Sequence, residues 1–378
     1  MKPSNSDIMK SSSTKETKFN NVEMLRFLFA WAIVGFHIVC DDAYDIYGLS
    51  FLKPFLYTPH SSSVAFFFVI AFFFLITKQN PKFSLLRFFT LKWFRLAPLL
   101  IVVTIIGYIL YLTYHPWGWV MSSNIESILL IQDWTNISRF SSFITPAWWC
   151  HVYMLVSVFY LGLTKTFKKR HMPFIIGVIA YMGWRTYILE PVLPSYGSIM
   201  MHCHIGMALM CLGIAFLVTN LPCMPIIMIR RKNWAYMWSF VELGCLCAIL
   251  GHLFAHSYTV QSYNTAILAF GIIFYLFINH SGYISRLLET PISAILGRYA
   301  YAIFIVHMLV LRVAHSLILP HCKNWAISHP WYVLAFMCGA IMLLAVIGHH
   351  CVEKPAIRWG QAQLKRITAL TNSPHMDI

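Results

Sequence analysis

Apolar runs close to the length of a membrane-spanning helix fill almost the whole chain. An α-helix needs about 20 apolar residues to cross the hydrocarbon core of a bilayer. The sequence therefore predicts an all-α, polytopic membrane bundle of about ten transmembrane helices. The predicted spans are residues 22–40, 62–77, 96–114, 146–164, 173–189, 199–218, 236–254, 263–279, 293–315 and 331–352.

The composition is typical of a membrane protein rather than a soluble one. Of the 378 residues, 59% are hydrophobic and 11% are charged, and the mean hydropathy is +0.66. A soluble surface needs far more charge than this. The net charge of +15 would also suit a nucleic-acid-binding protein. The basic residues, however, form short clusters between the apolar runs, so we predict the lipid bilayer as a partner and no nucleic acid.

These basic clusters also predict the orientation of the bundle. Cytoplasmic loops of membrane proteins carry an excess of Lys and Arg. With the N-terminus in the cytoplasm, every second loop is basic, and the predicted outer loops hold only Lys53, Arg139 and Lys323. We therefore expect both termini in the cytoplasm.

The chain is predicted to be one membrane domain with two polar ends. Residues 1–21 are expected to form a disordered cytosolic tail, residues 22–360 the membrane domain and residues 361–378 a short cytosolic tail. The cysteines include no CxxC pair, and His202 and His204 point to different faces of a predicted helix. We predict no metal site.

Two ionisable side chains occur within the first predicted span. Arg26 and His37 are eleven residues apart, which is about 16 Å and almost three whole helical turns, so both point the same way. Such groups are costly within a membrane and indicate a functional site by default. The alternative is that Arg26 extends to lipid phosphates and His37 hydrogen-bonds a neighbouring helix.

Further candidates lie at both predicted ends of the bundle. Lys92 and Arg95 could bind the phosphates of a ligand at the cytosolic end, or anchor their helix among anionic lipids. His307 lies in the middle of a predicted span, where a structural role is the alternative. Side chains near the outer ends could line a cleft for an acceptor substrate; they are Asp41, Trp148, Arg185 and Arg312.

Five short motifs in this order resemble the membrane acyltransferase family 3. The resemblance covers about residues 20–360. The motifs are Arg26 with His37, Phe67-Phe68-Val69-Ile70, Lys92 with Arg95, Leu296-Gly297-Arg298-Tyr299-Ala300-Tyr301 followed by Phe304 and His307, and Glu353-Lys354-Pro355.

Two departures from the family pattern limit what can be transferred. Ala71-Phe72 replaces a Ser-Gly pair in the second motif. Many members also carry a glutamate shortly after the Trp of the fourth helix, and the segment Trp148–Tyr153 has none. A role for that carboxylate is therefore not expected here.

The resemblance implies an enzyme that moves an acyl group across the membrane. The donor would be a cytosolic acyl-CoA, with acetyl-CoA as the leading candidate, and its phosphates would meet Arg26, Lys92 and Arg95. His37 would act as general base, with His307 as a second catalytic residue. The acceptor would be a hydroxyl of an extracytoplasmic or lipid-linked glycan. The expected location is the inner membrane of a bacterium.

Two other functional classes are also compatible with the sequence. A transporter or flippase for a sugar-like or lipid-linked substrate could use the same intramembrane Arg and His to line its path. It would move substrate without consuming acyl-CoA. A scaffold or sensor without chemistry would leave Arg26 and His37 without a role.

Overall fold

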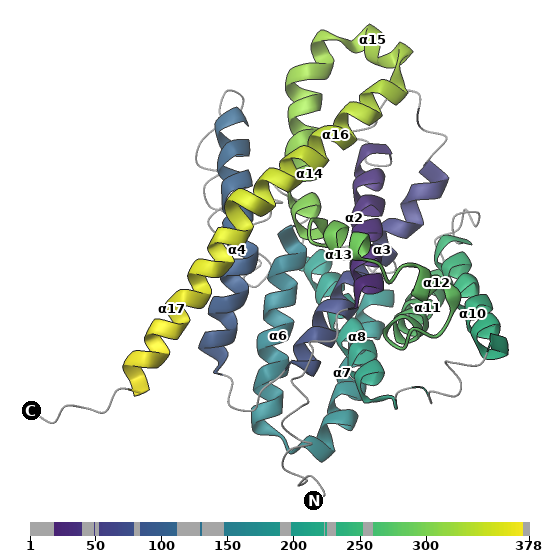
Figure 1. The fold of residues 1–378 in the computed structure, drawn as a ribbon, viewed down its shortest axis with the longest axis vertical. Coiled ribbons are helices and arrows are strands. Elements are labelled where there is room, and N and C mark those ends of the chain that lie inside the picture. Colours follow the sequence, from purple (N-terminus) through teal and green to yellow (C-terminus); the bar gives the residue numbers. More distant parts are fainter. Residues whose placement is uncertain are drawn as a thin grey trace, which may run out of the picture.

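The protein is entirely helical in the residues that the computed structural model describes, and no strand occurs among them (Figure 1). These residues are 19–39, 49, 53–78, 84–111, 129–130, 147–189, 198–222, 224, 232–251 and 260–372. The predicted all-α character is therefore confirmed within these ranges.

Helices of the first half are α2 (Asn20–Val39), α3 (Lys53–Thr77), α4 (Leu85–Tyr111), α6 (Trp148–Thr166), α7 (Met172–Leu189) and α8 (Ser198–Asn220). Those of the second half are α10 (Lys232–Gly251), α11 (Val260–Ile278), α12 (Tyr283–Leu287), α13 (Pro291–Gly297), α14 (Ala300–Val313), α15 (Lys323–Ser328), α16 (Pro330–Gly348) and α17 (Lys354–Asn372). Short 3₁₀ turns cover Lys169–His171 and Leu319–His321, and π-helical turns cover Ala314–Ile318 and His349–Glu353.

Four helical segments in the described part of the chain are long and apolar enough to cross a membrane: Asn20–Val39, Leu85–Gly107, Ala300–His321 and Pro330–Arg366. Shorter apolar helices cover Ser63–Thr77, His204–Asn220 and Ile267–Ile278. The described residues therefore do not reach the predicted count of ten spans. Helices α6, α7 and α10 interrupt their apolar residues with Trp, Tyr, His and charged side chains, which lowers their hydropathy.

Aromatic side chains from three helices form the centre of the bundle. Phe29 of α2 lies 4.4 Å from Phe66 of α3 between ring centroids, and Phe270 of α11 lies within 5.3 Å of both. Phe29 belongs to the buried face of α2, which repeats every three or four residues and includes His37. This packing turns the face of α2 that carries His37 towards the other helices.

Helices α7 and α8 approach closely because small residues face each other. A Cβ atom added to Gly183 would lie 2.6 Å from the backbone oxygen of Gly206, and one added to Gly206 would lie 2.7 Å from that of Gly183. Close approach through small residues is common between membrane helices. The pair packs beside α3, and so supports the wall of the bundle that carries the site described below.

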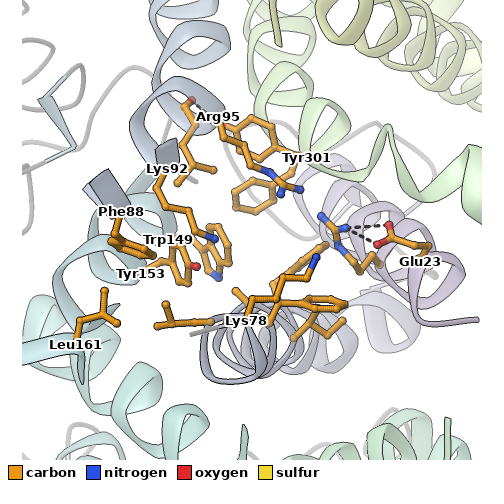
Figure 2. A pocket seen from close by; sticks show the side chains of 17 residues that line it. Glu23, Lys78, Phe88, Lys92, Arg95, Trp149, Tyr153, Leu161 and Tyr301 are labelled. Carbon is orange, nitrogen blue, oxygen red and sulfur yellow. Dashed lines mark hydrogen bonds and ion pairs between the residues drawn. The ribbon is translucent and has the colours of Figure 1, made fainter. Parts of the chain in front are cut away.

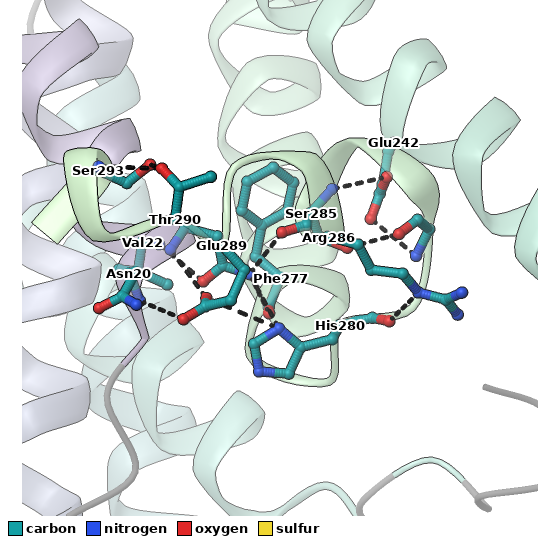
Figure 3. A network of polar contacts seen from close by, with 12 residues as sticks. Asn20, Val22, Glu242, Phe277, His280, Ser285, Arg286, Glu289, Thr290 and Ser293 are labelled. Atoms are coloured by element: carbon teal, nitrogen blue, oxygen red, sulfur yellow. Dashed lines mark hydrogen bonds and ion pairs between the residues drawn. The ribbon is translucent and has the colours of Figure 1, made fainter. Parts of the chain in front are cut away.

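The start of α2 is fixed by a group of polar contacts that we call the capping network (Figure 3). The carboxylate of Glu289 accepts hydrogen bonds from the backbone N–H groups of Asn20 and Asn21, at 3.1 and 3.0 Å. The buried Asn21 side chain donates to the carbonyl oxygens of Phe277 and Ser285. A negative charge at a helix N-terminus is favourable, because the first N–H groups have no partner within the helix.

The second carboxylate of the capping network is Glu242 of α10. Although it is fully buried, it accepts hydrogen bonds from the backbone N–H groups of Gly282, Ile284 and Ser285, at 3.0 to 3.3 Å. Gly282 leaves no room for a side chain, because a Cβ atom would collide with the Glu242 carboxylate. The network thus holds the segment between α11 and α13 against the start of α2. This is the end of α2 that the sequence predicts to be cytosolic.

Candidate functional site

A cavity of about 370 Å³ opens between α2, α3, α4, α6 and α14 (Figure 2). Its lining combines aromatic and aliphatic side chains with five charged ones. Pockets that bind small molecules have volumes of about 300 to 1,000 Å³ and this mixture of surfaces. The cavity is therefore large enough for part of an extended ligand.

Four cationic side chains line this cavity: Arg26, Lys78, Lys92 and Arg95. Arg26 lies two turns into α2, Lys78 directly after α3, and the other two in the first turns of α4. Neighbouring helices run in opposite directions here, so the start of α2, the end of α3 and the start of α4 meet. The three phosphate-binding residues predicted from the sequence are thus brought together, and Lys78 is an addition that sequence reasoning missed.

Glu23 is the acidic residue among the described residues that line the cavity. Its carboxylate oxygens accept hydrogen bonds from Nη1 of Arg26 at 3.0 and 2.8 Å. Sequence reasoning missed Glu23, although a spacing of three residues before an arginine is a signal for an ion pair on one helix face.

Gly297 fixes the position of Glu23. A Cβ atom added to this glycine at the end of α13 would lie 2.5 Å from the Glu23 Cβ and 2.6 Å from its Oε2. No side chain therefore fits between α13 and α2 unless Glu23 moves. The Leu296-Gly297 motif in this way supports the orientation of Arg26 through its ion pair with Glu23.

Lys92 and Arg95 lie almost one turn apart, so both face the cavity. Ser84 caps their helix, because its hydroxyl accepts a hydrogen bond from the backbone N–H of Arg87. The ammonium group of Lys92 lies 5.1 Å from the ring centroid of Tyr153. Among the described residues, no carboxylate pairs with Lys92 or Arg95. Their charges are therefore available to an anionic ligand.

Part of the cavity wall, next to Lys92, is aromatic. Trp149 and Tyr153 are one helical turn apart on α6 and stack with an interplanar angle of 5° and a centroid distance of 5.3 Å. Phe304 of α14 lies 6.1 Å from Trp149 and 6.0 Å from Phe67. Nearby, the Tyr301 hydroxyl donates to the Leu96 carbonyl and joins α14 to α4. The wall is apolar except for the polar atoms of Trp149 and Tyr153.

The two predicted catalytic histidines lie beside each other. The ring centroids of His37 and His307 are 5.3 Å apart, and both side chains are buried. His307 Nδ1 lies 3.2 Å from the Ile303 carbonyl oxygen, which can only accept, so this hydrogen bond requires a proton on Nδ1. Phe304 lies between this pair and the cavity along α14, 6.2 Å from His307.

Three of the four residues predicted to contact an acceptor lie outside the cavity lining. Trp148 stacks on His204 of α8, with a centroid distance of 3.7 Å. Arg185 is exposed on α7, and Arg312 is half-buried near the end of α14. None of these three lines the cavity, and Asp41 lies outside the described residues. An acceptor site formed by these residues stays a prediction.

The motif Glu353-Lys354-Pro355 lies where α16 passes into α17. Glu353 is buried within the π-helical turn, and its Oε2 lies 2.9 Å from His349 Nδ1. Next to it, the Tyr299 hydroxyl lies 3.2 Å from His350 Nε2. Two motifs that are far apart in the sequence thus meet next to α14. Neither Glu353 nor His349 lines the cavity, so their contacts stabilise its surroundings.

Within the described ranges, no group of three or more His, Cys, Asp and Glu residues could hold a metal ion. The expectation of no metal stays a prediction. No protein-family model, curated protein or solved structure matches this chain.

Proposed function

We propose that the protein is an integral membrane acyltransferase. It would move an acyl group, acetyl first among the candidates, from acyl-CoA to a hydroxyl of an extracytoplasmic or lipid-linked glycan. The observation that carries this proposal is the cavity that joins four cations to an aromatic wall, with two buried histidines beyond Phe304.

The charges in the cavity favour a ligand with several negative charges. Four cations face one carboxylate, Glu23, which is already bound to Arg26. Phosphates are the groups that such clusters of Arg and Lys bind most strongly. Acyl-CoA carries several phosphate charges on one end and a long, thin arm on the other. The cavity is at the lower end of the size range for ligand sites, so it would hold the arm and the nearest phosphates.

The histidine pair supplies the chemistry of the proposed reaction. His37 would take the proton of the acceptor hydroxyl while the hydroxyl oxygen attacks the thioester carbon. The new C–O bond forms, the C–S bond breaks, and the proton passes to the departing thiolate. General-base catalysis of this kind contributes about 10² to 10⁴ in rate. His307, whose Nδ1 is hydrogen-bonded to the Ile303 carbonyl oxygen, would orient His37 or the acceptor.

The orientation proposed for the protein follows the distribution of basic residues. The cation-lined end of the bundle would face the cytoplasm, where acyl-CoA occurs, and both termini would lie on that side. We propose that the three shorter apolar helices and helices α6, α7 and α10 also cross the bilayer, giving about ten spans. The inner membrane of a bacterium is the proposed location.

The proposal is tested by the binding and turnover of radiolabelled acetyl-CoA by the purified protein in nanodiscs. We expect Arg26→Ala to lose most of the binding, and His37→Ala to keep binding but lose turnover. Arg170→Ala is the matched control, because Arg170 is an exposed cation outside the cavity. If wild-type protein neither binds nor consumes acetyl-CoA or longer acyl-CoAs, the proposal is wrong. Substrate flux without acyl-CoA consumption would then favour a transporter.

A further inference from the structure

Two buried hydrogen-bond donors in the cavity wall have no partner among the described residues. They are the indole N–H of Trp149 and the hydroxyl of Tyr153. Trp149 is 8% exposed and Tyr153 is 2% exposed. Buried polar side chains in proteins are nearly always hydrogen-bonded, so each exception needs an explanation.

The position of these two donors distinguishes them from another buried polar group of α6 that has no described partner. Both side chains line the cavity, and their rings stack on each other (Figure 2). Ser157 of α6 also has a buried oxygen without a partner in the described residues, but it does not line the cavity. Among the described residues, only Trp149 and Tyr153 combine a buried donor that has no partner with a place in the cavity lining.

The neighbours of the donors indicate the chemistry of that ligand. The ammonium group of Lys92 lies above the Tyr153 ring, so the donors are next to the cations that would bind phosphate. On their other side are Phe67 and Phe304, which are apolar. A ligand that fits would carry a negative group, and next to it a thin, mainly apolar segment with one or more hydrogen-bond acceptors.

We infer that Trp149 and Tyr153 form a recognition site for the amide carbonyls in the pantetheine arm of acyl-CoA. This inference rests on the proposed function and adds to it the residues that distinguish the arm from the nucleotide. The arm joins the phosphates to the thioester and carries two amide groups. Bonds from Trp149 and Tyr153 to these carbonyls would direct the thioester along α14 towards Phe304 and the histidines.

A site of this kind discriminates strongly against ligands that lack the acceptor. When such a ligand occupies the cavity, the buried donors are left without hydrogen bonds, and this cost opposes binding. The same reasoning gives the expected effect of a substitution. Tyr153→Phe removes one donor but keeps the ring that stacks on Trp149, so the shape of the wall is preserved.

The test compares two ligands on each variant by equilibrium binding in nanodiscs: acetyl-CoA, and adenosine 3′,5′-bisphosphate, which lacks the arm. We expect Tyr153→Phe to weaken acetyl-CoA binding about tenfold and to leave the bisphosphate unchanged. Trp149→Phe should act in the same direction. Lys92→Ala should weaken both ligands.

Tyr160→Phe is the matched control, because Tyr160 is a buried tyrosine of the same helix that does not line the cavity. It should change neither affinity. The melting temperature of the ligand-free protein shows that each variant is folded, and Tyr153→Phe should not lower it.

Three outcomes would overturn the inference alone, provided that wild type binds acetyl-CoA. In the first, Tyr153→Phe and Trp149→Phe bind both ligands like wild type. In the second, they weaken both ligands equally, as a distorted cavity would. In the third, palmitoyl-CoA binds much more tightly than acetyl-CoA, and both variants bind it like wild type. The acyl chain, and not the pantetheine arm, would then contact the aromatic wall. Failure of wild type to bind any acyl-CoA overturns the proposed function and the inference together.

Discussion

The capping network and the cavity both place polar side chains inside the bundle. They differ in whether these groups have hydrogen-bond partners and opposite charges. In the capping network, Glu242 and Glu289 receive hydrogen bonds from backbone N–H groups that would otherwise lack partners. Among the described residues that line the cavity, four cations face one acidic group, and two donors have no described partner. The paired groups of the capping network hold helices together, whereas the unpaired groups of the cavity wall lie where a ligand can bind.

The largest effect on stability is expected for Glu242→Ala. The substitution leaves the backbone N–H groups of Gly282, Ile284 and Ser285 buried without an acceptor, which costs about 3 kcal/mol or more in the free energy of unfolding. Thermal unfolding in detergent, followed by tryptophan fluorescence, measures the change. Glu23→Ala, which removes a carboxylate from the cavity, should lower the melting temperature much less. Equal effects would show that the two regions do not differ as we describe.

A double substitution tests the cavity. Lys92→Ala combined with Arg95→Ala removes two charges that have no acidic partner in the described residues, so the melting temperature should stay the same or rise. The affinity for acetyl-CoA should fall about 100-fold, since each charge-assisted hydrogen bond contributes about 1.5 kcal/mol or more. Isothermal titration in nanodiscs measures the affinity. A large loss of stability with unchanged affinity would assign both residues to the structure.

Gly297→Ala connects the two regions, because this glycine lies between α13 and Glu23. The new methyl group must displace Glu23, which disturbs Arg26, so we expect about a tenfold loss of acetyl-CoA affinity and a loss of roughly 1 to 3 kcal/mol in stability. Gly339→Ala is the matched control, since its Cβ would meet no atom within 4 Å. That variant should be as stable as wild type or slightly more stable. Indistinguishable behaviour of the two variants would contradict the role of Gly297.

The smallest effect is expected for Glu23→Gln. The carboxylate competes with a phosphate for Arg26, so its removal should raise the affinity for acetyl-CoA about threefold at low salt. The amide can still accept a hydrogen bond from Arg26 and hold it in place. The gain should shrink when the titration is repeated at high salt. A fall in affinity would mean that Glu23 positions Arg26 more than it competes for it.

Much of the candidate site follows from spacing along single helices. Arg26 and His37 share a face of α2 because eleven residues make almost three turns, and Lys92 and Arg95 share a face for the same reason. The prediction of Trp148 as a site residue shows the limit of such reasoning, because its neighbour Trp149 lines the cavity instead. The two are adjacent and point about 100° apart, and only packing decides that Trp149 lines the cavity while Trp148 stacks on His204.

The sequence by itself determined a helical bundle rich in apolar residues, the clusters of basic residues, and the residues of α2 and α4 that face one way. These properties depend on composition and helical period, which are local. Only the tertiary structure decided that Lys78 joins the cations, that Gly297 fixes Glu23, that His37 meets His307, and that Trp149 and Tyr153 face the cavity. Contacts between helices depend on which faces pack together, and no period along one helix contains that information.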